Sequence, residues 1–281
     1  MLRADVGPLS FDRGPLVPVV AYLLTIAVLA GLSLDSVGGP PSPLLGVAWG
    51  VVLAVIAAGA FAVAGVSLRS VVPVPRSALS AAGLLLVFWT LYNLVVYGLA
   101  VAGVAGFEPA ASRVLAHPLP YLAALASAFL FTALPEELFF RAYLQSSVTS
   151  LVRGGPRRAV AVGVGVAAVL FALFHLPRWF LALGHGVGGA LAGRLVELLV
   201  IGLAYGTVYA LTRNLWLVAL LHATMNQPPV LVAGHVPPGL VLPSLVVELG
   251  AAVALVAAAT RLGDWSGPAV AGLGDAASPE E

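Results

Sequence analysis

The sequence of 281 residues contains no cysteine, and charged residues make up only 9% of it. Without cysteine the protein has no disulfide, no thiolate metal ligand and no cysteine nucleophile. Soluble domains carry about 25% charged residues, whereas 60% of these residues are hydrophobic. The composition therefore indicates a protein that crosses the lipid bilayer several times.

Lysine is also absent, so all 13 basic residues are arginines, and the formal net charge is +1. No basic stripe of the kind that binds nucleic acid is present, and we expect no nucleic-acid partner. The first 14 residues carry two arginines and two aspartates, and no small-residue cleavage site closes the apolar run that follows. We therefore expect no removable signal peptide.

Long apolar runs recur along the chain, and a helix of roughly 20 residues spans about 30 Å of hydrocarbon. The runs of this length lie near 16–34, 44–68, 79–106, 121–149, 159–176, 191–212 and 240–260. A shorter run, 215–227, lies between Arg213-Asn214 and Pro228-Pro229, which predicts a half-length helix covered by protein. The sequence thus predicts an all-α fold, a polytopic transmembrane bundle of about eight helices.

We expect three parts in the chain. They are the first spans in 1–118, a catalytic core in 119–227, and the last span with a disordered cytoplasmic tail in 228–281. Arginine placement predicts the orientation, because cytoplasmic loops carry the positive excess. With the N-terminus inside, the cytoplasmic arginines are Arg3, Arg13, Arg69, Arg76, Arg153, Arg157, Arg158, Arg213 and Arg261. Arg113 and Arg178 then lie outside, which predicts a multi-pass protein of the cell membrane with both termini in the cytoplasm.

Two adjacent glutamates, Glu136 and Glu137, lie inside an apolar run, where a charge costs at least ~2.5 kcal/mol on insertion scales. Neighbouring helical residues point about 100° apart, and Arg141 follows Glu137 at the spacing of a favourable ion pair. We expect Glu137 to pair with Arg141 and Glu136 to stay free for acid–base chemistry. The alternative is a buried ion-pair network of all three residues that only holds helices together.

Two histidines, His175 and His222, end later apolar runs. Phe171 and Asn226 each lie four residues from one of these histidines and therefore on the same helical face. One imidazole can share a water molecule with Glu136, while the other imidazole and the carboxamide can donate hydrogen bonds to an oxyanion. A single histidine at the end of a span is more often structural, but together with the glutamates the pattern predicts hydrolysis.

The depth of these residues follows from the helical rise of 1.5 Å per residue. Glu136 comes out ~22 Å below the outer end of its span and His222 ~12 Å above the inner end of its helix, both in the cytoplasmic half of the bilayer. His175, however, comes out ~25 Å from the inner end of its span. Either the helix that carries His175 starts below the surface or tilts, or the site is deeper.

Three motifs occur in order: Glu136-Glu137-x-x-x-Arg141, Phe171-x-x-x-His175 and His222-x-x-x-Asn226. They resemble the motifs of the CPBP family, which includes CaaX prenyl endopeptidases and bacteriocin-processing or immunity-related membrane proteins. The resemblance covers roughly residues 121–227. It implies that Glu136 and His175 activate a water that attacks the scissile carbonyl, that His222 and Asn226 stabilise the oxyanion, and that Glu137 and Arg141 support them.

This mechanism needs no cofactor, but a zinc version is an alternative. Glu136, His175 and His222 would make a set of two histidines and one glutamate like that of soluble metallopeptidases, with Glu137 as a further possible ligand. We favour the metal-free version because Asn226 suits an oxyanion hole better than a zinc shell. The chain has no His-Glu-x-x-His motif and no Gly-x-Ser-Gly loop in a span.

We therefore expect a glutamic intramembrane endopeptidase that cuts a membrane-anchored peptide or protein. The alternative is a catalytically idle scaffold of the same fold that regulates a partner such as a sensor kinase, although every motif residue is present. A proton-coupled transporter fits less well, because no pair of related broken helices is detectable. The alanine-rich, lysine-free composition is typical of prokaryotes, so a membrane-bound peptide, leader or signalling protein is a better candidate substrate than a prenylated protein.

Polar residues in other spans have structural explanations. Arg194 and Glu197 lie three residues apart and are expected to pair with each other. Glu248 has no partner in its own span, so it is expected to face the bundle. Asn93 is expected to form an interhelical hydrogen bond, with a substrate entry path along Tyr92, Asn93 and Tyr97 as the alternative.

Overall fold

The computed structural model describes residues 14–34, 43–72, 75–104, 107–234 and 238–262. Within these ranges, seven helical segments are long and apolar enough to cross a membrane. Five of them are single helices: α1 (Leu16–Leu34), α2 (Pro43–Val63), α3 (Pro75–Val101), α9 (Gly189–Thr212) and α11 (Val241–Leu262). The predicted polytopic helical fold is confirmed, whereas the acidic tail lies outside the described residues.

The other two membrane-length segments, Pro118–Leu151 and Pro156–Ala182, each contain several helices. The first consists of α5 (Pro118–Ala128), η2 (Phe129–Ala133), α6 (Leu134–Glu137), η3 (Leu138–Gln145) and α7 (Ser146–Leu151). The second consists of α8 (Pro156–Phe174) and η4 (Arg178–Ala182). The segments η2, η3 and η4 are π-helical, a widened geometry that is frequent at functional sites.

Pro135 explains the π-helical turn that precedes the glutamates. Proline has no N–H to donate to the carbonyl four residues earlier, and its ring pushes that carbonyl away. The helix widens here to a π-helical turn, in which the N–H of Leu134 donates to the carbonyl oxygen of Phe129. The same stretch is approached by α2 at Gly50, where any side chain would collide with the backbone of Phe131. Proline and glycine together therefore fix the segment that leads into Glu136.

Helix α10 (Leu215–Asn226) is the predicted half-length helix. Arg213 ends α9 in a left-handed conformation with φ of 53°. The buried side chain of Asn214 then caps α10 by accepting a hydrogen bond from the N–H of Leu217 at 3.2 Å. This sharp reversal sends α10 back into the bundle with His222 on its last turns.

Close helix packing brings α8 and α9 together. A Cβ atom at Gly202 of α9 would lie 2.9 Å from Cα of Ala168, which is on α8. One turn later, a Cβ at Gly206 would lie 3.0 Å from a Cγ of Val164. Small residues at such contacts are typical of membrane helices, and here they hold the helix of His175 against the helix of Tyr205.

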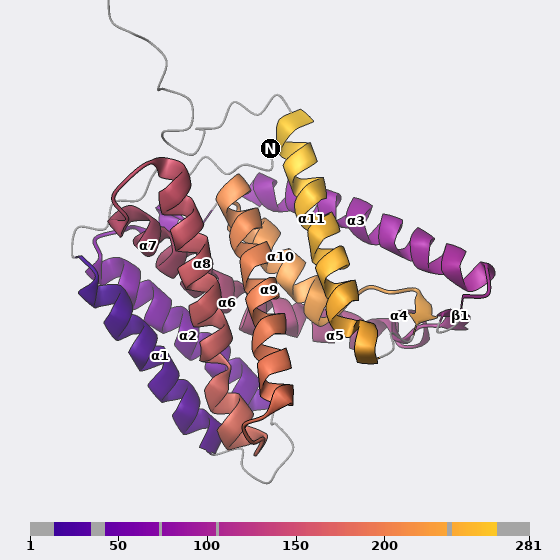
Figure 1. Ribbon diagram of the computed structural model, residues 1–281, viewed down its shortest axis with the longest axis horizontal. Coiled ribbons are helices and arrows are strands. Elements are labelled where there is room, and N and C mark those ends of the chain that lie inside the picture. Colours follow the sequence, from indigo (N-terminus) through magenta and orange to yellow (C-terminus); the bar gives the residue numbers. More distant parts are fainter. Residues whose placement is uncertain (1–13, 35–42, 73–74, 105–106, 235–237, 263–281) are drawn as a thin grey trace, which may run out of the picture.

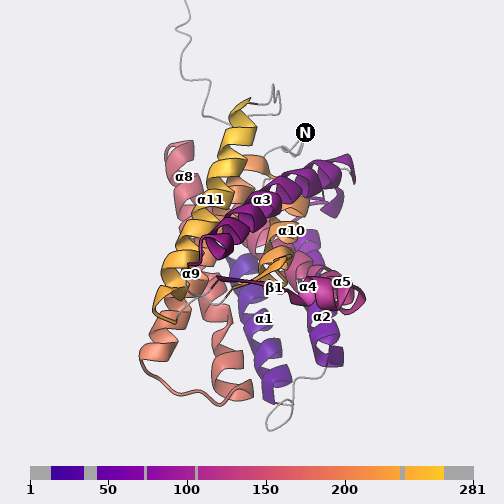
Figure 2. The ribbon, with the colours of Figure 1, turned by 90° about the vertical axis from the view of Figure 1, so that its right-hand side faces the viewer.

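Figures 1 and 2 show that α1, α2, α8 and α9 form an upright bundle, from which α3 extends to one side. Beneath α3 lie α5, α4 (Arg113–Ala116) and a two-stranded antiparallel sheet of β1 (Phe107–Ala111) and β2 (Val232–Gly234). The sequence did not predict this sheet, which pairs two loop segments. Short 3₁₀ turns, η1 (Leu68–Ser70) and η5 (Pro238–Leu240), precede α3 and α11.

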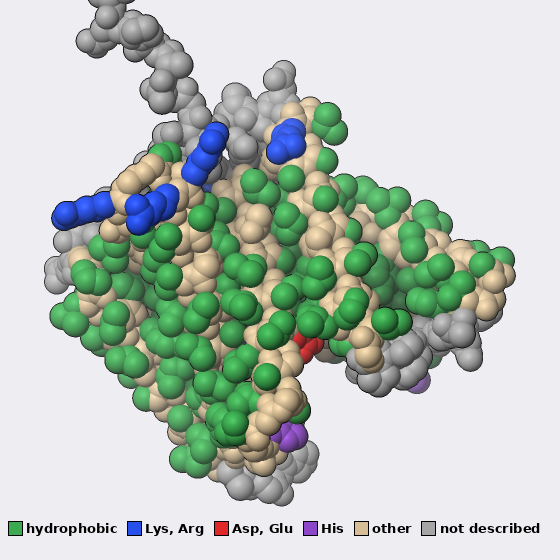
Figure 3. All heavy atoms as spheres, viewed as in Figure 1, with side chains coloured by type: hydrophobic (Ala, Val, Ile, Leu, Met, Phe, Trp, Pro, Cys, Tyr) green, Lys and Arg blue, Asp and Glu red, His purple; other side chains and the backbone are tan. Residues whose placement is uncertain are grey.

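The outer surface of the helices is apolar. Leu86 is 70% exposed and Val247 72% exposed, and large apolar side chains cover the face seen in Figure 3. A surface of this kind is suited to lipid. Arginine side chains gather at the upper end of that face, around the tops of α8 and α11 (Figure 3). The described part of the chain is therefore that of a multi-pass membrane protein with a charge difference between its two ends.

Candidate active site

A cavity of about 370 Å³ brings the predicted polar residues together. Its lining includes Glu136 from α6, His175 from the end of α8, and His222 and Asn226 from α10. Tyr92 of α3, Tyr205 of α9 and Glu248 of α11 line the same cavity. Glu137 and Arg141 do not line it and are fully buried behind it.

Glu137 connects two of the predicted residues. One of its oxygens accepts a hydrogen bond from Nε of Arg141 at 2.8 Å, so the predicted ion pair is present. The other oxygen lies 2.8 Å from Nδ1 of His222. Since an ionised carboxylate only accepts, Nδ1 of His222 carries the proton. Glu137 thus fixes the orientation of the His222 ring and leaves Nε2 toward the cavity.

Arg141 is fully buried, and the terminal nitrogens of its guanidinium group have no hydrogen-bond partner among the described residues. The centre of the guanidinium group lies 5.1 Å from the ring centroid of Phe171, a cation–π contact. The ring of Phe171 also lies 4.8 Å from that of His175 and 6.2 Å from that of His222. Phe171 therefore packs at the centre of the cluster.

The carboxylate of Glu136 belongs to the lining of the cavity. It is buried, and within the described ranges no side chain donates a hydrogen bond to it. Its nearest basic partner is Nε2 of His222, at 3.9 Å. That separation exceeds hydrogen-bond length, which leaves the carboxylate oxygens for a water molecule or a substrate.

His175 occupies the C-cap of α8. Its Nδ1 lies 2.8 Å from the carbonyl oxygen of Phe171, one turn earlier on the same helix. A carbonyl only accepts, so Nδ1 of His175 is the donor and Nε2 of the neutral ring is free to accept a proton. The Phe171-x-x-x-His175 spacing thus sets the tautomer of the histidine.

Hydrogen bonds from two helices fix the segment that follows α10, next to Asn226. The hydroxyl of Tyr121 donates to the oxygen of Gln227 at 3.0 Å. The side chain of Asn93 donates to the oxygen of Pro229 at 3.0 Å and accepts from the N–H of Leu231. Asn93 therefore bonds to the loop after α10 and not, as the sequence had predicted, to another helix, while its neighbour Tyr92 lines the cavity.

The depth predicted for Glu136 assumed that residues 121–149 form one straight helix. This stretch is instead divided by two π-helical turns, so the rise of an α-helix does not give the depth of Glu136. Glu136 and His175 line one cavity despite their different calculated depths.

Several charged residues of the cavity were not predicted as site residues. Arg194 and Glu197 form the expected ion pair at 2.7 Å, but both also line the cavity, together with Arg178 and Glu248. Arg178 follows His175 by three residues and therefore lies on the same side of the chain, a signal that the sequence offered. Arg194 and Glu248 have no such spacing to a motif residue, so the sequence could not place them in the cavity.

The residues of the alternative zinc set, Glu136, His175 and His222, line the same cavity. In the described part of the chain, no group of three histidine, aspartate or glutamate side chains is placed to hold a metal ion. Nδ1 of His222 and Nδ1 of His175 are both engaged in hydrogen bonds. The Nε2 atoms of both rings make no hydrogen bond within the described ranges.

Fold and cavity together define a membrane protein with a buried carboxylate and imidazole cluster, a combination suited to hydrolysis. Residues 118–227 match the family model described as "Rce1-like: Type II CAAX prenyl endopeptidase Rce1-like". The match contains all three motifs, confirms the predicted family for this segment and indicates a protease. No curated protein and no solved structure matches the chain in the other two comparisons.

Proposed function

We propose that the chain is an intramembrane endopeptidase of the glutamic type, with Glu136 as the base. The observation that carries this proposal is a single cavity lined by Glu136, His175, His222 and Asn226, which come from three different helices. The family match over residues 118–227 supports the same class of reaction.

In the proposed mechanism, a water molecule lies between the carboxylate of Glu136 and Nε2 of His175. Glu136 takes one proton as the water oxygen attacks the carbonyl carbon of the peptide bond. The carbonyl oxygen becomes an oxyanion, to which the Asn226 carboxamide and a protonated Nε2 of His222 donate hydrogen bonds. Glu136 then returns the proton to the amide nitrogen, and the C–N bond breaks to give an acid and an amine.

Glu137 and Arg141 act as positioning residues. Glu137 holds Nδ1 of His222, and Arg141 holds Glu137 in place through their ion pair. The contact with Glu137 leaves Nε2 of His222 as the ring nitrogen that lies near Glu136, at 3.9 Å. The oxyanion donor is thus prepared by residues outside the cavity.

The substrate is proposed to be a membrane-anchored peptide or protein, because apolar helices surround the cavity and the matched family is named for prenyl endopeptidases. The lipid bilayer is the second partner. The end of the bundle that carries most of the arginines is proposed to face the cytoplasm of the cell.

The test is cleavage of a library of membrane-anchored peptides by the purified protein in lipid nanodiscs, with products read by mass spectrometry. We expect Glu136→Gln to lower the rate by a factor of about 10²–10⁴, the usual contribution of a general base. Ser150→Ala, at a partly buried hydroxyl outside the cavity, serves as a control that keeps the rate. Equal rates for wild type and Glu136→Gln would refute the glutamate mechanism, and no cleavage by folded wild type would favour the idle scaffold.

A further inference from the structure

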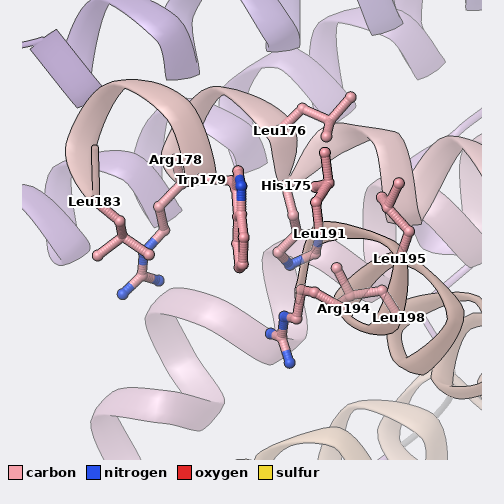
Figure 4. A pocket seen from close by; sticks show the side chains of 9 residues that line it. All are labelled: His175, Leu176, Arg178, Trp179, Leu183, Leu191, Arg194, Leu195 and Leu198. Atoms are coloured by element: carbon pink, nitrogen blue, oxygen red, sulfur yellow. The ribbon is translucent and has the colours of Figure 1, made fainter. Parts of the chain in front are cut away.

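A second, smaller cavity of about 250 Å³ adjoins the catalytic cavity. Both cavities are lined by His175, Arg178, Arg194 and Leu198, so these residues form the boundary between them. Figure 4 shows the small cavity, with the guanidinium ends of Arg178 and Arg194 pointing to the same side of it. Two cations therefore lie beside the histidine that is proposed to hold the water.

The two guanidinium groups have hydrogen-bond donors to spare. Arg194 uses one nitrogen for Glu197, at 2.7 Å, and a guanidinium has five N–H donors. Arg178 makes no ion pair with any residue in the described ranges. An arginine with a free planar fork matches a carboxylate in a bidentate arrangement.

The rest of the small cavity is apolar and is held in shape by the loop that follows η4. Its other lining residues are Leu176, Trp179, Leu183, Leu191 and Leu195. Nε1 of Trp179 donates to the oxygen of Gly186 at 3.1 Å, and its ring packs 4.5 Å from that of His185. The wall next to Arg178 is therefore anchored, and the pocket is suited to an aliphatic group that carries an anion.

We propose that Arg178 and Arg194 form a carboxylate-binding subsite next to His175, with Arg178 as the principal donor and the leucine-lined pocket taking an aliphatic side chain. This inference rests on the proposed function, because the carboxylate belongs to the substrate or to the cleaved fragment. It can be the α-carboxylate of a chain end or the side chain of an acidic residue. Both present the same two oxygens to the guanidinium groups.

The test measures binding rather than cleavage and uses the Glu136→Gln variant in nanodiscs of zwitterionic lipid. Three fluorescent peptides with aliphatic residues near their C-termini are compared. The first is a free acid, the second its carboxamide, and the third a carboxamide with glutamate as its last residue. We expect a peptide with a carboxylate to bind about tenfold more tightly than the plain carboxamide. Adding Arg178→Gln should abolish this preference, while adding Arg153→Gln, at an exposed arginine of another loop, should leave it intact.

Each outcome has a defined meaning. Tight binding of the free acid alone supports the subsite with a chain end as its ligand, and equally tight binding of the glutamate peptide supports it with either source. Equal binding of all three peptides, or a preference that survives Arg178→Gln, would overturn the subsite. Because no cleavage is measured, a failure of the proposed protease activity is read separately in the assay of wild type.

Discussion

At the scale of single residues, the site depends on one buried carboxylate with two partners. Glu137 is fully buried and accepts from both Arg141 and His222. Burying a charge costs desolvation free energy, which only well-placed partners can offset. The spacing of Glu137 and Arg141 predicted the first contact, since it is local. The second contact joins residues 85 positions apart, which no local spacing can predict.

The first prediction concerns Arg141. Replacing it in Arg141→Met leaves Glu137 without its cation, and breaking a buried ion pair in this way costs about 3–5 kcal/mol. We expect this loss in the free energy of unfolding, measured by denaturant titration in mixed micelles. Arg153→Met, at an exposed loop position, should change the value by less than about 0.5 kcal/mol. The double variant with Glu137→Gln should recover part of the loss, and no recovery would show that Arg141 stabilises by packing alone.

The second prediction concerns metal removal. If Glu136 activates water directly, dialysis against a strong chelator should leave the cleavage rate within about twofold of the untreated protein, because no metal-activated water is involved. Loss of activity on chelation, with recovery on adding zinc, would instead support a site made of Glu136, His175 and His222. The measurement is the initial rate in nanodiscs, with a zinc peptidase treated in parallel as the positive control.

At the scale of the elements, hydropathy predicted the positions of the spans well, because a run of apolar residues directly reports burial in lipid. It could not predict that the span with the glutamates is divided by π-helical turns, or that β1 pairs with β2. Pro135 was visible, but a proline can end, kink or widen a helix, and the close approach of α2 at Gly50 is a tertiary contact that no local pattern predicts. The shared cavity likewise required packing to bring α6, α8 and α10 together.

The third prediction tests this packing. Gly202 lies where any Cβ would meet Cα of Ala168 at 2.9 Å, so Gly202→Leu must push α9 away from α8. Overpacking of this kind costs about 1–3 kcal/mol. Gly193→Leu is a matched control in the same helix, because no atom lies within 4 Å of its Cβ position. We expect a lower Tm and slower cleavage for Gly202→Leu, and a Tm near that of wild type for Gly193→Leu. Equal effects would refute close helix contact at Gly202.

At the scale of the whole molecule, the lack of cysteine is an experimental advantage. Any single cysteine introduced into this chain is the only one, so its labelling reports one position. Gly155 precedes α8 and Gly186 lies in the loop before α9. Figure 1 shows the start of α8 and the connection into α9 at opposite ends of the bundle. Neither position has an atom within 4 Å of a built Cβ. Cysteine is therefore tolerated at both.

The fourth prediction uses these positions to determine the orientation. In intact cells, a membrane-impermeant maleimide should label Gly186→Cys and leave Gly155→Cys unlabelled if the arginine-rich end faces the cytoplasm, as proposed. Both should react after lysis, which controls for accessibility of the thiol. The reverse pattern would invert the orientation. The result also bears on the reaction, since Trp179 joins the wall of the carboxylate pocket to the loop of Gly186. If that loop is outside, the proposed carboxylate subsite at Arg178 lies toward the outer end of the bundle. We then expect the fragment bound there to leave on the side opposite the arginine-rich end.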